Sequence, residues 1–251
     1  MMPSLTEVLS DLDALSSEDE FKRRLDRTYA AMGFSRFSYV GMSPEMGLDP
    51  EGHRNPQDVI FLTNVPSAWV DHYLDSEYQD CDPIIRECYA ARLPIRWTEN
   101  FRANARTDRE SGVLNDALDF GIRRGFTVPL HGPGGELGIM SLYSELDDGE
   151  FARALHQHQY ELLVTSHYFH DAVQRALKAA AVGPKPIPLT DREVEILQWT
   201  AIGKTAWEIG SILKISERTV NFHLQNIMAK FGVHNKTHAA AKALSFGLIR
   251  P

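Results

Sequence analysis

The sequence lacks the features of a secreted or membrane-inserted protein. Its 251 residues include only two cysteines, Cys81 and Cys88, and a single pair at this spacing fits neither a disulfide framework nor a zinc site. No apolar run reaches the roughly 18 residues that a membrane span needs. The start of the chain is acidic and has neither the basic region nor the apolar segment of a signal peptide. We therefore expect a cytoplasmic protein with reduced cysteines and no membrane association.

Signatures of common enzyme classes are missing as well. The sequence has no nucleophile elbow, no HxHxDH-like metal motif and no Gly-rich phosphate loop. Histidines do occur in two short groups, His156-Gln-His158 and His167-Tyr-Phe-His170. They fall on a predicted helix at offsets that divide them between its faces, whereas metal ligation needs converging side chains and a further ligand. We therefore expect solvated histidines, no catalytic residue, no metal and no cofactor.

Basic charge is scarce in most of the chain but not at its end. The whole sequence has 26 Lys and Arg against 34 Asp and Glu, a net charge of -8. Residues 189–251 hold 8 basic and 5 acidic residues, a net charge of +3, so residues 1–188 carry -11. A local basic excess suits contact with DNA phosphates, while the acidic remainder limits indiscriminate adhesion to DNA.

A proline-rich stretch divides the chain. Residues 179–188, AAAVGPKPIP, place three prolines within five positions, which removes backbone donors and favours an extended connector over a helix. The sequence therefore predicts an N-terminal domain at 1–178, a linker at 179–188 and a C-terminal domain at 189–251.

The N-terminal domain mixes helical and strand-like patterns. Helical periodicity covers 21–32 and 68–78. Strand-like apolar runs occupy 37–40, 59–62, 127–130 and 139–143. The last two runs are joined through His131-Gly-Pro-Gly-Gly135, whose glycines favour a tight reversal, so they predict an antiparallel hairpin. A long helix is expected from about 149 to 178, and the domain as a whole should be of the α/β type.

Two capping boxes open the C-terminal domain. Thr190 stands three residues before Glu193, at the start of an apolar-periodic segment that ends at Gly203. The same arrangement follows at once, with Thr205 three residues before Glu208. These signals predict two short helices in series.

A third helix follows after a short turn. Ser216 can cap it, and Gly232 can end it after Phe231. With a fourth helix at about 237–246, this spacing predicts a helix-turn-helix. Its inward positions are Val220, Leu224, Ile227 and Phe231, and its outward positions are Arg218, Asn221, Gln225 and Asn226. Outward Asn, Gln and Arg side chains can read base edges in a major groove, although a plain four-helix bundle with ordinary surface polar residues would show the same pattern.

This region resembles the LuxR-type helix-turn-helix over about sixty residues. The similarity rests on LTDREVEILQW, AIGKT, EIGSIL, SERTVNFH and KFGVHNKTHAAAKALSFGLI. It places Glu193, Leu197 and Gly203 on positions that the family keeps in its DNA-binding unit. The resemblance further implies that Asn221 and Gln225 contact bases. It implies phosphate-side roles for Lys204, Thr205, Arg218 and His223, of which His223 could equally be a packed core residue.

The N-terminal domain shows no β/α rhythm of a phosphorylation receiver. Instead it resembles the autoinducer-binding domain of quorum-sensing LuxR-type receptors, which bind N-acyl-homoserine lactones. The matching residues are Trp69, Tyr73, Asp82-Pro83, Trp97, Gly125 and the segment VPLHGPGGELGIMSLYSE. The resemblance implies an N-terminal α/β/α sandwich around a central antiparallel sheet, α+β in class, followed by an all-α four-helix bundle.

The resemblance also implies a ligand site. Trp69 would donate its indole N–H to the lactone carbonyl, and Asp82 would accept a hydrogen bond from the amide N–H, as suits a donor-only and an acceptor-only group. Tyr73 and Trp97 would supply aromatic walls, and Ser141 would bind the acyl amide. Taken singly, each aromatic residue is more often core than contact, so the joint spacing carries the argument. Val65 and Ile84 complete the expected lining.

One position departs from the family pattern. Many relatives carry a tyrosine four residues before the lactone-binding tryptophan, where this sequence has Val65. The hydroxyl that would bind the amide carbonyl is therefore lost. Either Ser141 or another tyrosine such as Tyr39 replaces it, or the ligand differs in this part.

We accordingly expect a homodimeric transcription regulator that binds a small-molecule autoinducer and palindromic double-stranded DNA, with RNA polymerase as a further partner. The long helix at 149–178 is the expected dimer surface. Two alternatives stay open at this point. One is an enzyme such as a lactonase or acylase that acts on the same molecules. The other is a LuxR-type regulator that answers a non-lactone signal or acts without ligand, which Val65 favours.

Overall fold

The computed structural model describes residues 17–42, 59–97, 101, 105–132, 137–180, 188–245 and 247–250. The chain divides into two compact units, and the boundary between their main segments falls between residues 181 and 182. We call the described residues 17–180 the N-terminal unit and 188–250 the C-terminal unit. Most of the expected linker, residues 181–187, lies outside the described residues.

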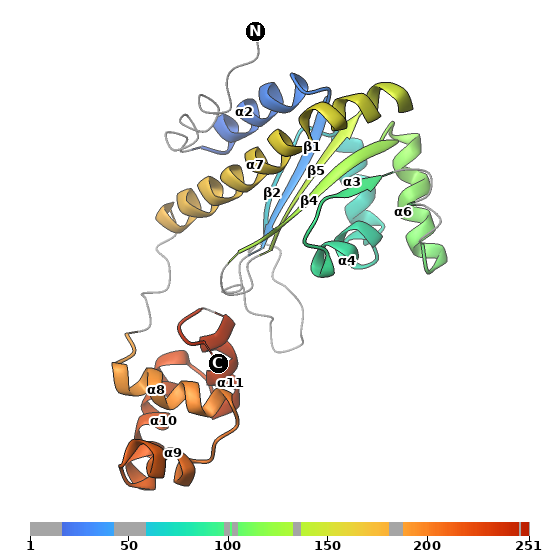
Figure 1. The fold of residues 1–251 in the computed structure, drawn as a ribbon. Coiled ribbons are helices and arrows are strands. Elements are labelled where there is room, and N and C mark those ends of the chain that lie inside the picture. Colours follow the sequence, from blue (N-terminus) through green and yellow to red (C-terminus); the bar gives the residue numbers. More distant parts are fainter. Residues whose placement is uncertain are drawn as a thin grey trace. The chain divides into compact units, whose positions relative to one another are not determined.

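The N-terminal unit contains a five-stranded sheet between helices (Figure 1). Its elements are α2 (Glu18–Ala30), β1 (Arg36–Met42), β2 (Val59–Thr63), α3 (Ser67–Asp75), η2 (Tyr78–Asp80), α4 (Pro83–Ala90), β3 (Ile95–Trp97), α6 (Asp108–Asp119), β4 (Arg124–His131), β5 (Leu137–Ser144) and α7 (Asp148–Ala180). The strands run in the order β2-β1-β5-β4-β3, and each neighbouring pair is antiparallel. The predicted antiparallel pairing of the last two strand-like runs is confirmed as β4 and β5, with Pro129 opposite Ile139, while the glycines at 133–135 of the predicted reversal lie outside the described residues.

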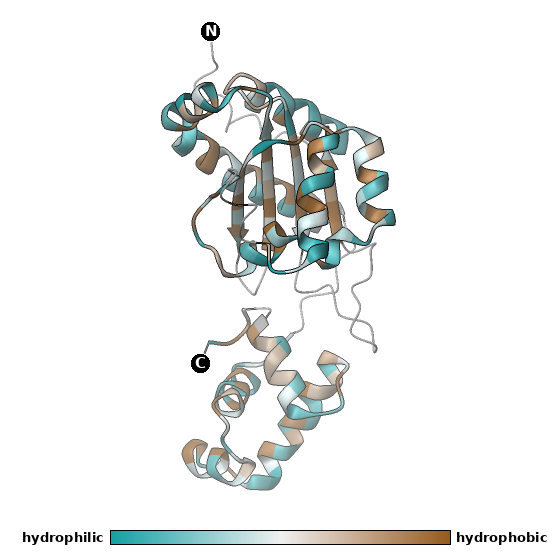
Figure 2. Ribbon diagram, turned by 90° about the vertical axis from the view of Figure 1, so that its right-hand side faces the viewer, coloured by the Kyte–Doolittle hydropathy of each residue, from teal (hydrophilic) through white to brown (hydrophobic). Residues whose placement is uncertain are grey.

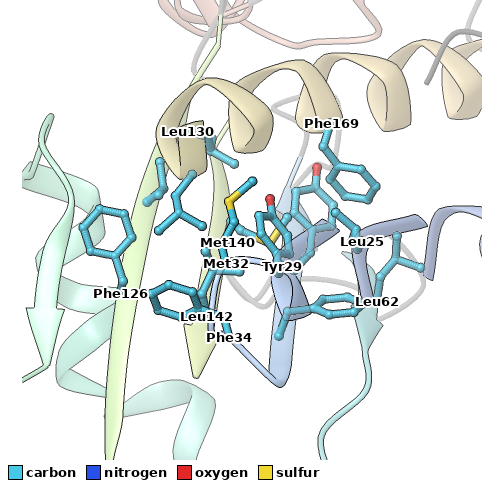
Figure 3. Packing of buried hydrophobic residues seen from close by; sticks show 14 of the residues in the cluster. Leu25, Tyr29, Met32, Phe34, Leu62, Phe126, Leu130, Met140, Leu142 and Phe169 are labelled. Carbon is cyan, nitrogen blue, oxygen red and sulfur yellow. The ribbon is translucent and has the colours of Figure 1, made fainter. Parts of the chain in front are cut away.

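One face of the sheet is covered by α2 and α7. Apolar side chains from both helices meet those of the strands in a continuous cluster that includes Phe21, Leu25, Phe126, Met140, Leu142, Leu162 and Phe169. Figure 3 shows part of this cluster, with Leu25, Met140 and Phe169 among the labelled residues. Phe169 of α7 makes edge-to-face contacts with Phe21 and Tyr39, at centroid distances of 5.4 and 5.3 Å. This face is the main hydrophobic core of the unit.

The other face of the sheet is covered by α3, α4 and α6 (Figure 1). Two smaller apolar clusters lie here, one around Ile84 and Cys88 and one around Val65, Trp69 and Tyr143, and Trp97 packs against both. In Figure 2 the helices of this unit alternate between hydrophilic and hydrophobic stretches, as expected for helices with one buried side.

Local signals explain some helix limits and not others. The predicted helix at 68–78 ends earlier, at Asp75, because Glu77 adopts a left-handed conformation with φ of 52° before the 3-10 turn. Helices α4 and α6 were not predicted. They are short, and their N-caps, Asp82 and Thr107, each accept a backbone N–H from the first turn.

The C-terminal unit is the predicted four-helix bundle. Its helices are α8 (Asp191–Ala201), α9 (Ala206–Leu213), α10 (Glu217–Phe231) and α11 (Lys236–Ser245). Both predicted capping boxes are present, and Ser216 caps α10 as expected. Gly203 and Gly232 have φ of 86° and 62°, the left-handed conformation that glycine adopts without steric cost. The predicted fold class is thus confirmed in both units.

Two contacts fix the geometry of this bundle. Gly210 lies so close to the turn before α10 that a Cβ there would stand 2.8 Å from the carbonyl oxygen of Ile215. Glu193 on α8 is buried, and its carboxylate accepts a hydrogen bond from Lys230 Nζ on α10 at 2.6 Å. Although burial opposes ionisation of Glu193, Lys230 and the bonds from Thr190 hold its pKa below the usual value.

Candidate ligand site and candidate nucleic-acid interface

Aromatic rings gather on α3, at the face of the sheet away from α7. Trp69 is buried and packs edge-on against Tyr73, with ring centroids 5.6 Å apart, and tilted against Phe120 at 5.3 Å. Val65, just before the helix, belongs to the same cluster. The spacing of four residues between 65, 69 and 73 therefore brings these side chains together, as the sequence predicts for residues at the start of and along one helix.

A carboxylate stands beside this aromatic cluster. Asp82 caps α4, where its Oδ1 accepts the backbone N–H of Ile84 at 2.7 Å, and its Oδ2 accepts the hydroxyl of Tyr73 at 2.9 Å. Burial raises the pKa of Asp82 and outweighs these two hydrogen bonds, which lower it. Burial and the neighbouring Asp82 raise the pKa of Tyr73 well above its usual value. The neutral phenol of Tyr73 thus donates to the desolvated carboxylate of Asp82. The oxygens of this carboxylate can accept further hydrogen bonds.

Polar groups of the sheet line the same face. The indole N–H of Trp97 donates to Thr127 Oγ1 at 2.8 Å, and Thr127 shares a hydrogen bond of 2.9 Å with Ser141. Gly125, opposite Trp97 in the β3–β4 pairing, makes room for the indole, because a Cβ there would lie 3.0 Å from the ring. The Trp97 ring therefore lies on this face of the sheet, and its indole N–H is already hydrogen-bonded to Thr127.

Three polar residues of this face were missed in the sequence. They are Ser38, Thr127 and Tyr143, which lie on β1, β4 and β5. The hydroxyls of Tyr143 and Ser38 are hydrogen-bonded at 2.7 Å, and the Tyr143 ring packs edge-on against Trp97 at 5.4 Å. The alternation of strands was the available signal, since Tyr143 stands two residues after Ser141 and must share its face.

Ile84 follows Asp82 on α4 and is buried in the cluster that includes Cys88 and Leu114. Its side chain therefore belongs to the apolar part of the same face. Cys81 and Cys88 are both free thiols, and burial raises the pKa of Cys88 to about 12, as expected for a packing residue.

The structure removes Tyr39 from the candidate site. Tyr39 is fully buried in the cluster under α7, where its hydroxyl forms a hydrogen bond of 2.7 Å with His170 Nδ1. Its neighbours Ser38 and Val40 point to the opposite face, because successive residues of a strand alternate. Tyr39 therefore lies across the sheet from Trp69 and Asp82, and the suggestion that its hydroxyl replaces the missing tyrosine is not supported by its position.

The histidines of α7 are only partly solvated. His156 and His167 are exposed as expected, but His158 and His170 are buried. His158 pairs with Glu161 at 2.6 Å, and His170 with Tyr39. Among the described residues, no three His, Cys, Asp or Glu side chains lie close enough together to hold a metal ion.

No helix in the described part of the chain is both long enough and apolar enough to cross a membrane.

A polar network ties the helices over this face together. Asp116 of α6 accepts hydrogen bonds from His72 Nε2 of α3 at 2.7 Å and from the Tyr78 hydroxyl of η2 at 2.6 Å. These two donors hold the pKa of Asp116 below its usual range. A second tie joins α4 to α6 through the ion pair of Arg86 and Glu110. The network was not foreseen in the sequence, since it joins residues 44 positions apart.

In the C-terminal unit, one stripe of α10 is exposed. Arg218, Asn221 and Gln225 are exposed as predicted, while Asn226 is half-buried. Phe222, which the sequence did not predict as a surface residue of the helix, lies on the same stripe and is 59% exposed. The intervals of three, four and seven residues place these four side chains on one side of the helix, opposite Val220 and Leu224.

The remaining positions that the family resemblance assigned to phosphate contact lie near the start of α9 and on α10. Thr205 caps α9, and its hydroxyl bonds to Glu208 at 2.9 Å. The same carboxylate accepts the backbone N–H of Thr205 at 2.8 Å and lies 2.9 Å from Lys204 Nζ. The backbone N–H of Thr205, Lys204 and the Thr205 hydroxyl together lower the pKa of Glu208 to about 2. His223 is half-buried beside Phe222, with ring centroids 5.9 Å apart. Lys204 and Thr205 therefore have partners within the protein as well as exposed surface.

Comparison with protein families identifies both units. Residues 17–173 match the autoinducer binding domain, and residues 187–243 match the bacterial regulatory proteins of the luxR family. Transcriptional activator protein AnoR of Acinetobacter nosocomialis is 31% identical over 97% of this chain and 98% of its own length. The HTH-type regulator y4qH of Sinorhizobium fredii is 38% identical over 75% of this chain, a match that spans 56% of its own length.

Solved structures show the same architecture. Escherichia coli SdiA is similar with a TM-score of 0.72 and 26% identity over 98% of both chains. SdiA in complex with octanoyl-rac-glycerol gives a TM-score of 0.70 over 98% of this chain and 96% of that one. The proteins of this group are transcriptional regulators, which confirms the prediction of a regulator rather than an enzyme. The chain therefore belongs to the LuxR family of quorum-sensing transcriptional regulators, with an autoinducer-binding domain followed by a helix-turn-helix DNA-binding domain.

Proposed function

We propose that this regulator binds an N-acyl-homoserine lactone on the α3–α4–α6 face of its N-terminal unit and, as a dimer, binds palindromic promoter DNA. The observation that carries the proposal is the meeting of Asp82, an acceptor, with aromatic and aliphatic side chains on a face that also bears hydroxyl groups. An uncharged molecule with a lactone ring, an amide and an apolar tail needs a mostly apolar site with a few fixed polar groups.

Each residue of this face then has a role. Trp69 donates its indole N–H to the lactone carbonyl, and Asp82 accepts the amide N–H. Tyr73 holds the carboxylate of Asp82 through their 2.9 Å hydrogen bond and forms part of the aromatic wall. Trp97 and Ile84 line the apolar part, and Ser141 faces the acyl amide.

A second ligand class follows from one residue and one relative. Val65 removes a hydroxyl that many lactone receptors carry, and the structurally similar SdiA has been solved with octanoyl-rac-glycerol, which is not a lactone. An uncharged acyl compound without the lactone ring is therefore the alternative ligand. It would use the same apolar lining but not the contact of Trp69 with a ring carbonyl.

For DNA, the exposed stripe of α10 is the proposed reading surface. Asn221 and Gln225 can each pair with adenine through a donor and an acceptor, and Arg218 can bind guanine or a phosphate. Phe222, between them on the stripe, offers an apolar contact of the kind made to thymine methyl groups. Lys204, Thr205 and His223 are the proposed phosphate contacts. RNA polymerase is the proposed partner in transcription.

The proposed dimer uses α7. This helix exposes two large aromatic side chains, Tyr160 at 74% and Tyr168 at 52%. Two copies related by a two-fold axis would place two recognition helices on successive half-sites of one face of the duplex, and the second contact would become intramolecular.

Ligand-dependent stability tests the proposal directly. The full chain is purified with and without N-acyl-homoserine lactones of short and long acyl chains, and thermal unfolding and mass spectrometry of bound molecules are recorded. A ligand at 100 times its dissociation constant should stabilise the folded state by about 2.7 kcal/mol, since it binds the folded state alone. A shift with acylglycerols only would favour the non-lactone alternative. Equal melting temperature and equal operator binding with and without every compound would contradict the proposal.

A further inference from the structure

Strand β5 carries a tyrosine on the face of the sheet where Val65 leaves no hydroxyl. Tyr143 is 8% exposed and belongs to the same cluster as Val65 and Trp69, on the face that carries the candidate ligand site. Its ring packs edge-on against Trp97. A tyrosine thus belongs to the same apolar cluster as Val65, the position that lacks a hydroxyl.

The Tyr143 hydroxyl belongs to a row of polar groups across three neighbouring strands. Ser38, Ser141 and Thr127 are partners in the strand register, so they stand side by side on the sheet. Trp97 donates to Thr127, Thr127 bonds to Ser141, and Tyr143 bonds to Ser38. Ser141 and Tyr143 stand two residues apart on β5 and share one face, so both hydrogen-bonded groups belong to the same row.

The row has more donor protons than internal hydrogen bonds. The indole and the four hydroxyls carry five donor protons, one each, whereas three hydrogen bonds join them. Two protons are therefore in excess of the bonds within the row. A row of donors with surplus protons on a face lined by apolar side chains suits an acceptor from outside, such as a carbonyl oxygen.

The acceptor side of the same site is Asp82. Its Oδ2 accepts the hydroxyl of Tyr73, and the Tyr73 side chain packs against the cluster that contains Tyr143, so Asp82 and Tyr143 border the same cluster. Burial raises the pKa of Tyr143 to about 12, which keeps its phenol neutral. A neutral phenol donor and a carboxylate acceptor that face one cluster match the two ends of a secondary amide, its carbonyl and its N–H.

We infer that Tyr143 is a ligand-binding residue, whose hydroxyl, supported by Ser38, donates a hydrogen bond to the amide carbonyl of the ligand while Asp82 accepts the amide N–H. The inference rests on the proposed function, because it assumes a ligand with an acyl amide. In many relatives a tyrosine before α3, at the position of Val65, fills this role, whereas here a residue of β5 would fill it. Val65 and Tyr143 would then together determine the ligand specificity.

The test compares the full-length Tyr143→Phe variant with the wild type by titration of two ligands. One is an N-acyl-homoserine lactone, and the other is its thioamide analogue, in which a weakly accepting sulfur replaces the carbonyl oxygen. Loss of one hydrogen bond to the carbonyl should weaken binding of the lactone about tenfold, and binding of the thioamide much less. Ser38→Ala, on the next strand, should act in the same direction with a smaller effect, and Val65→Tyr in the Tyr143→Phe background should restore affinity for the lactone.

Tyr29→Phe is the matched control. Tyr29 is a fully buried tyrosine on the other face of the sheet, with its hydroxyl 3.0 Å from Ser166 Oγ, so its loss should change stability but not affinity. Unchanged affinity of Tyr143→Phe for the lactone, or an equal loss for both ligands, would overturn the inference while leaving the proposed function intact. Failure of the wild type to bind either ligand would overturn the proposed function itself and this inference with it.

Discussion

The two units of this regulator place their proposed functional groups differently. In the C-terminal unit the side chains that would contact DNA are exposed on α10, while the core of Ile196, Leu197, Val220 and Ile227 is sealed beneath them. In the N-terminal unit the groups that would contact a ligand are buried or half-buried among core residues. Function and stability should therefore separate cleanly in one unit and be coupled in the other.

In the N-terminal unit, ligand binding and stability should be coupled on only one face of the sheet. The α7 face contains the main apolar cluster and also buries polar pairs such as Tyr39 with His170, whereas the opposite face brings a carboxylate together with several hydroxyls that suit a polar ligand. Burying polar groups costs free energy unless they are paired, so a ligand that completes their hydrogen bonds stabilises the fold.

The largest effect should come from the α7 face. Phe169→Ala removes a fully buried ring that contacts Phe21 and Tyr39, and it should lower the free energy of unfolding by about 4 kcal/mol. Chemical denaturation measures this loss. Ligand affinity of the folded variant should stay unchanged, and a loss of affinity would show that the two faces are not independent.

Asp82→Asn should have the opposite effect to Phe169→Ala, since it should lower ligand affinity and leave stability largely unchanged. Asparagine also caps a helix, so α4 is kept, but it no longer offers a charged acceptor, and ligand affinity should fall by about 2 kcal/mol. Without ligand the variant should be as stable as the wild type or more stable at neutral pH. The pKa of Asp82 is raised, so its protonated form favours folding and this contribution is lost as the pH rises through that pKa.

Calorimetric titration and thermal unfolding across pH measure both parts of this prediction. The wild type should gain stability relative to Asp82→Asn as the pH is lowered toward the pKa of Asp82. A variant that loses stability at neutral pH but retains full affinity would place Asp82 in the fold and not in the site.

Glu193→Gln tests the core of the C-terminal unit and should cost about 2 kcal/mol of its stability, because Lys230 loses a charged partner. The pKa of Glu193 is lowered, so its contribution is complete above the usual value of 4.5 and is lost as the pH falls through the lowered pKa. The difference between wild type and variant should therefore shrink in acid. Glu195→Gln, an exposed partner of Arg192, is the control and should change stability by less than about 0.5 kcal/mol.

The smallest effect concerns the exposed stripe. Asn221→Ala should weaken specific DNA binding by about 1 to 2 kcal/mol without changing unfolding or ligand uptake. Arg218→Ala should instead reduce the salt dependence of binding if Arg218 contacts a phosphate. Fluorescence anisotropy with operator and scrambled DNA at several salt concentrations distinguishes the two. A stability loss from Asn221→Ala would break the proposed separation of surface and core.

The sequence was most informative where structure depends on neighbouring residues. The capping boxes at Thr190 and Thr205 and the stop at Gly232 predicted the helices of the C-terminal unit to within a residue or two, because caps and left-handed glycines act within one turn. The β4–β5 hairpin was predicted for the same reason. Helices α4 and α6 were not predicted, because their short apolar patterns do not by themselves distinguish a helix from other structures.

In the candidate site, the sequence identified Trp69, Tyr73 and Asp82 through family resemblance, and the structure brings them into one cluster. It did not reveal the polar row of the sheet, nor that Tyr39 belongs to the other face. The row exists because Ser38, Ser141 and Thr127 share one register position across three strands, and alternation along each strand alone cannot fix that alignment.

The amino-acid order by itself therefore determined the helices and turns, the division of charge and the family of this protein, because each depends on residues close together in the chain. The tertiary structure alone decided which hydroxyl groups share the face of the sheet near Asp82 and which tyrosine belongs to the cluster of Val65. Those contacts join residues from distant segments, and their geometry is set by strand pairing and by the helices that pack over the sheet.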